Sequence, residues 1–258
     1  MTQDNQTIDL LNARGSTRAY APTPLTDEEK QTVLHAAMRA PTAGNMMLYS
    51  IIEIDDQALK DRLAVTCDDQ PFIARAPWVL VFVADFQKWM DLFDCAGVER
   101  MEGLPHKVTP ELADLMLACS DALIAAQNAV VAAESLGIGS CYIGDIMEHG
   151  ETHAELLGLP QYTFPIAMLC FGRPKSRPRV TGHYENHMVH KNAYRRLSAA
   201  ELREVSDDLD SHFGERDFGA DSENAVQYVY RRKFTADFAA EANRSVAWWL
   251  ERWLAVAG

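Results

Sequence analysis

Two short basic segments of the sequence have the residue types that bind a phosphate group. The first, Arg14-Gly15-Ser16-Thr17-Arg18, places two guanidinium and two hydroxyl groups within five residues, and both kinds of group donate hydrogen bonds to phosphate oxygens. In the second, residues 172–179, prolines stiffen the chain and hold Arg177 and Arg179 on the same side of an extended segment. Taken alone, the first segment is more typical of a polar loop with surface arginines.

A third segment could border a flat heteroaromatic ring. In Ala40-Pro41-Thr42-Ala43-Gly44-Asn45, Pro41 ends a helix and small residues allow another molecule to approach the backbone. Thr42 and Asn45 offer both donors and acceptors. A plain helix-to-strand connection would also explain this segment.

A fourth segment, Leu136 to Gly144, contains three glycines. They do not fit the G-x-G-x-x-G dinucleotide pattern, and they follow a helix and precede a strand, which is the reverse of the order in that fold. We therefore expect Gly137 to cap a helix, Gly139 to lie in a turn and Gly144 to let the backbone contact a ligand.

A metal site is not expected from this sequence. His183, His187 and His190 have the spacing H-x-x-x-H-x-x-H, which matches no zinc signature, and no acidic ligand cluster accompanies them.

Hydrophobic periodicity and capping signals predict the elements that must position these segments. Thr26 and Glu29 form a capping box that opens a helix ending before Pro41, and Asp55 or Asp56 caps a short helix through Leu63. The longest helical pattern covers residues 111–136, and strands are expected at residues 49–54, 77–84, 138–143 and 164–171. Because helices and strands do not alternate as regular βαβ units, the sequence predicts an α+β fold, a sheet flanked by helices.

Composition limits the kinds of partner. The chain has 258 residues with 24 Lys and Arg against 37 Asp and Glu, a net charge of −13, so we expect no binding to nucleic acid. Five widely spaced cysteines and the lack of a signal peptide at the N-terminus favour a cytoplasmic location. The longest uncharged apolar stretch, residues 122–133, is shorter than the ~20 residues of a membrane span, so no membrane partner is expected.

The same apolar stretch and the aromatic C-terminal tail suggest a subunit interface, because both exceed what one core of this size should bury. We find no domain boundary before residue 197, and we expect residues 1–196 to form the main domain and residues 197–258 a helical extension that packs on a dimer.

The four segments, taken in their order along the chain, resemble the FMN-dependent nitroreductase superfamily. Its longer branch, the oxygen-insensitive NADPH nitroreductases and NADPH–flavin oxidoreductases, is the most similar, and the resemblance runs from Ile8 to Tyr194. It implies a homodimer with intertwined domains and FMN at the interface. By matching position, the implied cofactor-binding residues are Arg14, Ser16, Arg177 and Arg179 for the phosphate, Arg18 for N1 and O2, Thr42 and Asn45 from the neighbouring protomer, Gln70 for the pyrimidine edge, and Tyr142, Ile143 and Gly144 against the ring.

The resemblance also implies an activity. NADPH or NADH would transfer a hydride to the flavin N5, and a nitroaromatic, quinone or flavin oxidant would then take the electrons at the same face, in a ping-pong mechanism. The cofactor carries this chemistry, and Arg18 is the expected catalytic residue because its charge stabilises the reduced ring at N1–O2. Two alternatives stay open: a flavoenzyme of the same fold that fragments flavin or removes halogens reductively, and a flavin-storing protein without enzymatic activity.

The sequence departs from the family pattern at two site positions. Gly15 stands where a second arginine is common, and Asp145 stands where the longer branch usually has a second glycine after Tyr142-Ile143-Gly144. A carboxylate near N5 and O4 is expected to lower the flavin potential or to repel anionic oxidants.

Overall fold

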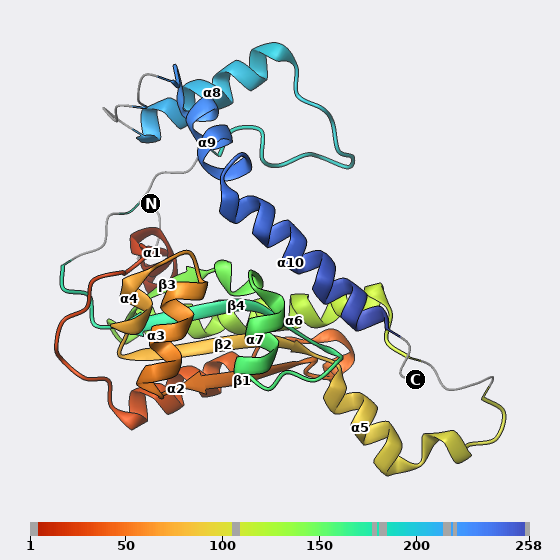
Figure 1. The fold of residues 1–258 in the computed structure, drawn as a ribbon. Helices are drawn as coiled ribbons and strands as arrows, with labels where there is room; N and C mark the ends of the chain where they lie inside the picture. The colour runs from red at the N-terminus through yellow and green to blue at the C-terminus, as the bar shows by residue number, and fades with distance from the viewer. Residues whose placement is uncertain are drawn as a thin grey trace. The chain divides into compact units, whose positions relative to one another are not determined.

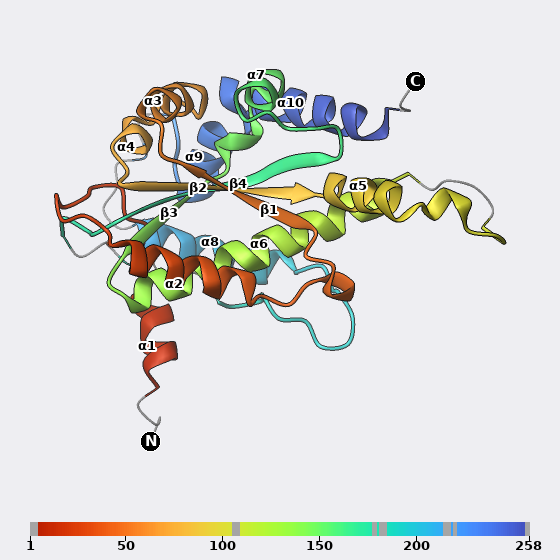
Figure 2. The same ribbon diagram turned by 90° about the horizontal axis from the view of Figure 1, so that it is seen from below.

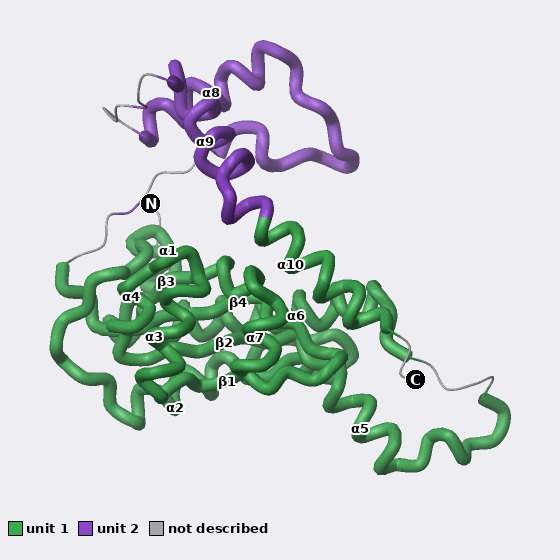
Figure 3. Tube along the Cα trace, viewed as in Figure 1, with its two compact units in different colours: residues 1–179, 241–258 green, residues 180–240 purple. Residues whose placement is uncertain are grey.

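The computed structural model describes residues 5–104, 109–176, 180, 185–213, 218 and 221–255. The chain forms two compact units: unit 1 comprises residues 1–179 and 241–258, and unit 2 comprises residues 180–240 (Figure 3). The boundary expected after residue 196 therefore falls inside unit 2, and the end of the chain returns to unit 1. The packing of the extension on a dimer stays a prediction.

Unit 1 is built around a four-stranded antiparallel sheet (Figure 1). Its strands are β1 (Tyr49–Ile54), β2 (Trp78–Asp85), β3 (Gly139–Ile143) and β4 (Thr163–Gly172), in the order β1-β2-β4-β3. These are the four strands that the sequence predicts. Every residue of β2 is buried, as expected for a strand with a continuous apolar run that is covered on both faces.

Helices cover both faces of the sheet, which confirms the α+β class (Figure 2). On one face lie α2 (Asp27–Met38) and α6 (Leu112–Ser135). The other face is covered by α3 (Gln57–Thr66), α4 (Pro71–Ala74), α7 (Gly150–Leu156) and the unit 1 part of α10 (Asp237–Leu254). Two buried hydrophobic clusters result. Trp249 and Trp253 of α10 belong to the cluster on the face covered by α3, α4 and α7.

The long helix α6 packs against the sheet of its own chain. Ala122, Ala126 and Ala129 have no exposed surface, so one face of this apolar stretch belongs to the core of the chain, and the stretch does not by itself indicate a subunit interface. By length and composition alone the helix could cross a membrane, but half of its most apolar part is buried, as in a core helix. From its start to its middle the helix leaves apolar side chains exposed, namely Leu112, Met116, Leu117, Leu123 and Ile124.

Local signals set the predicted helix ends. Thr26 and Glu29 form the expected capping box, and the Asp56 carboxylate accepts from the Leu59 N–H at 3.1 Å. Gly137 has φ +68° just after α6, where a glycine avoids the strain of the left-handed region.

The other helices are α1 (Gln6–Ala13) and α5 (Gln87–Ala96) in unit 1, and α8 (Ala199–Phe213) and α9 (Ala225–Phe234) in unit 2. The sequence did not predict α5 or the one-turn helix α4. The first residue before α5 is Phe86, which offers no side-chain cap, so the usual start signal is missing.

Candidate functional site

The first basic segment lies beside the edge strand β3. Ser16 forms a parallel bridge with Ser140, and the Thr17 N–H donates to the Ser140 carbonyl at 2.8 Å. The Ala21 N–H then donates to the Arg173 carbonyl at 2.8 Å. Residues 16–21 therefore connect β3 to the chain that follows β4.

Two glycines make this close approach possible. Gly139 and Gly172 are paired in the sheet. A Cβ on Gly139 would lie 2.2 Å from Thr17 Oγ1, and one on Gly172 would lie 2.5 Å from Tyr20 Cδ1. Gly139 was expected in a turn, but it begins β3, because the strand must leave room for Thr17.

Arg14, Ser16 and Arg18 gather around Cys141 of β3. Burial raises the pKa of the Cys141 thiol, while the charges of Arg18 and Arg14 and hydrogen bonds from Ser16 and Arg18 lower it. Burial also raises the pKa of Tyr142 to about 12, against the influence of Arg14. The structure thus brings the predicted residues of the first segment to one strand, with their positive charge beside it.

A small cavity next to these residues is lined by three cations. Its volume is about 220 Å³, and Arg18, Arg75 and Lys175 line it together with Tyr20. Within the part of the chain that the structure describes, none of the three pairs with a carboxylate. Such a concentration of unpaired positive charge, in a chain of net charge −13, favours an anionic ligand. Sequence reasoning did not identify Arg75 as a site residue, because this C-cap residue of α4 belongs to none of the four segments.

The second basic segment is described only in part. Arg173 pairs with Glu29 of α2 and donates to the Leu136 carbonyl, so this arginine holds elements together. Arg177 and Arg179, the expected phosphate ligands, lie outside the described residues.

Gln70 and Asp145 are directly connected. Gln70 precedes α4, and its Nε2 donates to the Cys67 carbonyl at 2.8 Å and to Asp145 Oδ2 at 2.7 Å. Asp145 begins the 3-10 helix η3 (Asp145–Met147) that follows β3. The carboxylate that departs from the family pattern is therefore bound to a predicted site residue.

A third side chain, the buried carboxyl group of Glu148, is hydrogen-bonded to Asp145 of this pair. Glu148 is only 3% exposed. Burial raises its pKa to about 7, and the charges of Asp145 and Asp68, a hydrogen bond to Asp145 and the charge of Glu241 act in the same direction. A group with this pKa holds a proton over much of the range below neutrality.

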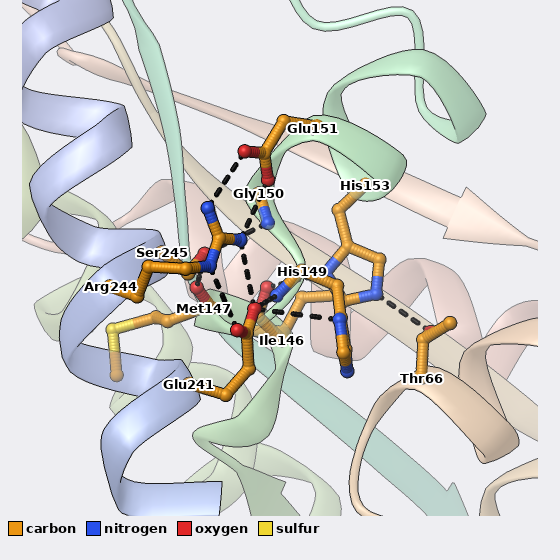
Figure 4. Close-up of polar contacts among 10 residues, drawn as sticks. All are labelled: Thr66, Ile146, Met147, His149, Gly150, Glu151, His153, Glu241, Arg244 and Ser245. Atoms are coloured by element: carbon orange, nitrogen blue, oxygen red, sulfur yellow. Dashed lines mark hydrogen bonds and ion pairs between the residues drawn. The ribbon is translucent and has the colours of Figure 1, made fainter.

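Helix α10 fixes the turn that carries these carboxyl groups (Figure 4). The Ser245 hydroxyl accepts from the Gly150 N–H at 2.8 Å and donates to the Met147 carbonyl at 2.6 Å. Arg244 pairs with Glu151 and Glu241, both at 2.8 Å. A Cβ on Gly150 would lie 2.7 Å from Trp248, so the turn and the helix are in tight contact.

His153 joins the same turn to α3. Its Nδ1 lies 2.8 Å from the Ile146 carbonyl and its Nε2 lies 2.7 Å from Thr66 Oγ1 (Figure 4). Burial lowers the pKa of this histidine. The neutral ring therefore acts as a fixed connection under η3.

Tyr142 and Ile143, the last residues of β3, and Gly144 after them differ in exposure. Tyr142 is 36% exposed and donates to Gln127 at 3.4 Å, and Gly144 is exposed. Ile143 is buried in the core. Of the predicted ring contacts, Tyr142 and Gly144 are accessible to a ligand, and Ile143 can contribute only its backbone.

The loop of Thr42 and Asn45 is held by a residue that sequence reasoning missed. Asp121 of α6 is buried, and its carboxylate accepts from the Ala43 N–H at 2.9 Å and the Leu48 N–H at 3.1 Å. A signal for this role was present, since Asp121 is the only charged residue from 115 to 133.

This loop lies at the other end of the sheet from the first basic segment. It precedes Tyr49, which pairs with Ala84 near the end of β2, whereas Trp78 at the start of β2 pairs with Phe171 beside Gly172. The length of β2, roughly 23 Å at 3.3 Å per residue, separates the two. One chain therefore does not bring Thr42 and Asn45 to Arg14–Arg18.

Comparisons with known proteins agree with this fold. The model of the nitroreductase family matches residues 11–173. The NADPH-flavin oxidoreductase of Vibrio harveyi is 27% identical over 92% of this chain and 93% of its own. The oxygen-insensitive NADPH nitroreductase of Salmonella typhimurium is 31% identical over 80% of this chain and 82% of its own. The structure of B. megaterium NfrA2 has a TM-score of 0.80, with 26% identity over 93% of this chain and 97% of its own.

The chain belongs to the nitroreductase family. The resemblance drawn from the four segments is thereby confirmed, and so is the expectation of an oxidoreductase.

Proposed function

We propose that this chain is an FMN-dependent NAD(P)H oxidoreductase that reduces nitroaromatics, quinones or flavins. One observation carries the proposal: Arg14, Ser16 and Arg18 gather beside β3, and the same strand leads to Tyr142 and Gly144, which are accessible. Positive charge beside an open strand end suits a ligand that has both a phosphate and a flat ring.

The residues present fit FMN. Arg14 and Ser16, together with Arg177 and Arg179, would hold the phosphate. Gln70 has a free carbonyl oxygen for the pyrimidine edge, since no described residue donates to its Oε1. The unpaired cations of the cavity at Arg18 add the positive charge that an anionic ligand needs in an acidic chain.

When bound, FMN would accept a hydride from NADPH or NADH at N5 and pass the electrons on to the oxidant. Arg18 would provide a fixed positive charge at the N1–O2 edge, where negative charge develops on reduction. No side chain needs to act as a general acid, because water can protonate the product.

A homodimer completes the site in this proposal. Thr42 and Asn45 lie about the length of a strand away from Arg18 in one chain, so they would contact the FMN of the partner. The exposed apolar side chains of α6, among them Met116 and Leu117, are a surface that a second copy would cover. We also propose a cytoplasmic location, in keeping with five free cysteines.

The proposal is tested by anaerobic reduction of the purified FMN-bound protein. NADPH or NADH should bleach the flavin absorbance, and nitroaromatics, quinones or free flavins, added one at a time, should restore it. Initial-rate plots at several fixed acceptor concentrations should be parallel. A flavin that neither nucleotide bleaches would refute the proposal and favour flavin storage, and intersecting plots would refute the ping-pong mechanism.

A further inference from the structure

We propose that Asp145 fixes the side-chain amide of Gln70 so that Gln70 offers only a hydrogen-bond acceptor to the ligand, and thereby selects a ring with an N–H donor at that edge. This inference rests on the proposed function, in which the ligand is a flavin. It assigns a positioning role to the carboxylate that departs from the family pattern.

Both amide hydrogens of Gln70 are already used. Nε2 donates to the Cys67 carbonyl at 2.8 Å and to Asp145 Oδ2 at 2.7 Å. A backbone carbonyl and a carboxylate are acceptors only. If the amide were turned over, Oε1 would face two acceptors, so the chemistry of the partners fixes its orientation.

The oxygen Oε1 is the atom left for a ligand. Among the described residues, none donates to it, and Gln70 is half-buried. The next residue, Pro71, has no N–H group with which to satisfy it. Oε1 is not among the enclosed side-chain atoms that lack a partner, so it is open to a donor from a ligand.

Glu148 contacts the same Asp145 side chain. It is buried and hydrogen-bonded to Asp145, and burial raises its pKa to about 7. The acidic groups that face it are Asp145, Asp68 and Glu241. Because Glu148 holds a proton more readily than an ordinary glutamate, it can donate a hydrogen bond to Asp145, whose Oδ2 accepts from Gln70.

Two histidines also border Glu148. His149 pairs with Glu241 at 3.4 Å, and the backbone of Glu148 is hydrogen-bonded to His153. Burial lowers the pKa of His153, so at neutral pH its uncharged ring adds no positive charge beside Glu148.

The ligand edge that fits Oε1 is an imide N–H between two carbonyl groups. The pyrimidine edge of a flavin has this pattern, with N3–H as its donor, and a methyl group on N3 removes that donor. A glycine at position 145 would remove the partner that holds the Gln70 amide. The amide could then turn and donate to a ring carbonyl instead.

The experiment compares two ligands on the flavin-free full-length protein. FMN and N3-methyl-FMN are titrated, and binding is followed by quenching of flavin fluorescence. The wild type should bind N3-methyl-FMN roughly 10- to 100-fold more weakly than FMN, because the bound ring would cover Oε1 and the methyl group would leave it without a donor. In Asp145→Gly this ratio should fall to about threefold or less. Asp145→Asn is the matched control, since its Oδ1 can still accept from Gln70, and it should keep most of the discrimination.

Folding is checked by circular dichroism, and Gln70→Ala provides a second variant that should lose the discrimination even if Asp145→Gly does not fold. Equal affinity of the wild type for both flavins, or an unchanged ratio in Gln70→Ala, would overturn the inference while leaving the proposed function intact. Failure of the wild type to bind either flavin would overturn both.

Discussion

Arg18 is the single residue on which the proposed chemistry depends most. It is exposed, lies beside Cys141, and has no carboxylate partner among the described residues. Arg18→Ala should lower the midpoint potential of bound FMN and reduce turnover roughly 10- to 100-fold, as expected for the loss of a hydrogen bond to a charged group. FMN content should fall much less. Spectroelectrochemical titration measures the potential, with Arg62→Ala on the exposed side of α3 as the control. An unchanged potential would show that Arg18 is not near N1–O2.

Glu148 makes stability depend on pH. Its pKa is raised from 4.5 to about 7 in the folded protein, so between these values the folded state holds a proton that the unfolded state has lost. The stability that the protonated Glu148 side chain contributes is fully present below about pH 4.5 and is lost as pH rises through 7. Glu148→Gln should therefore gain stability relative to the wild type as pH rises from 5 to 7, by up to about 1.4 kcal/mol per pH unit. Urea unfolding at each pH tests this, and a difference that does not change with pH would contradict it.

At the scale of elements, the contact between α10 and the turn after β3 should be a main support of the site. The Ser245 hydroxyl serves two backbone groups there, the Gly150 N–H and the Met147 carbonyl, and the residue has no exposed surface. Ser245→Ala should lower the free energy of unfolding by about 1–3 kcal/mol, because buried backbone groups lose their partner. Ser120→Ala is the control, since that exposed hydroxyl only donates to the Met116 carbonyl of its own helix. Equal effects of the two substitutions in urea unfolding would refute this role.

The elements that the sequence predicted have local signals. Thr26 and Glu29 begin α2, Asp56 caps α3, and Gly137 follows α6. Helix α5 was missed because Phe86 gives no capping signal. Contacts between distant residues have no such signal: Gln70 and Asp145 are 75 residues apart, and only the fold brings them together.

At the scale of the whole molecule, the family could be predicted because four short segments occur in a fixed order, although each was weak alone. Which of the site residues one chain brings together could not be derived from those segments. The separation of the Thr42–Asn45 loop from Arg18 follows from the register of β1 and β2, which depends on strand pairing. The implied contribution of a neighbouring protomer is compatible with this separation and stays a prediction.

Disrupting the exposed apolar surface of α6 should therefore affect both assembly and cofactor content. Met116 is 66% exposed and Leu117 is 48% exposed. The double substitution Met116→Glu and Leu117→Glu should give monomers that lose FMN on dilution, because charged groups cannot be buried in an apolar interface without a large cost. Val65→Glu is the control, since Val65 is 63% exposed on α3. Sedimentation velocity and flavin absorbance measure the two effects, and a double variant that remains a dimer with full FMN would contradict the expectation.

The path of the chain has a consequence for limited proteolysis. Unit 2 begins at residue 180 and ends at residue 240, and both of its ends continue into unit 1. The exposed side chains of Val189 and Tyr194 are the kind of position at which a protease cuts first. One cut there would divide the polypeptide, yet Trp249 and Trp253 would remain in the core of unit 1. The nicked protein should thus elute as an intact particle and separate into two fragments only in denaturant.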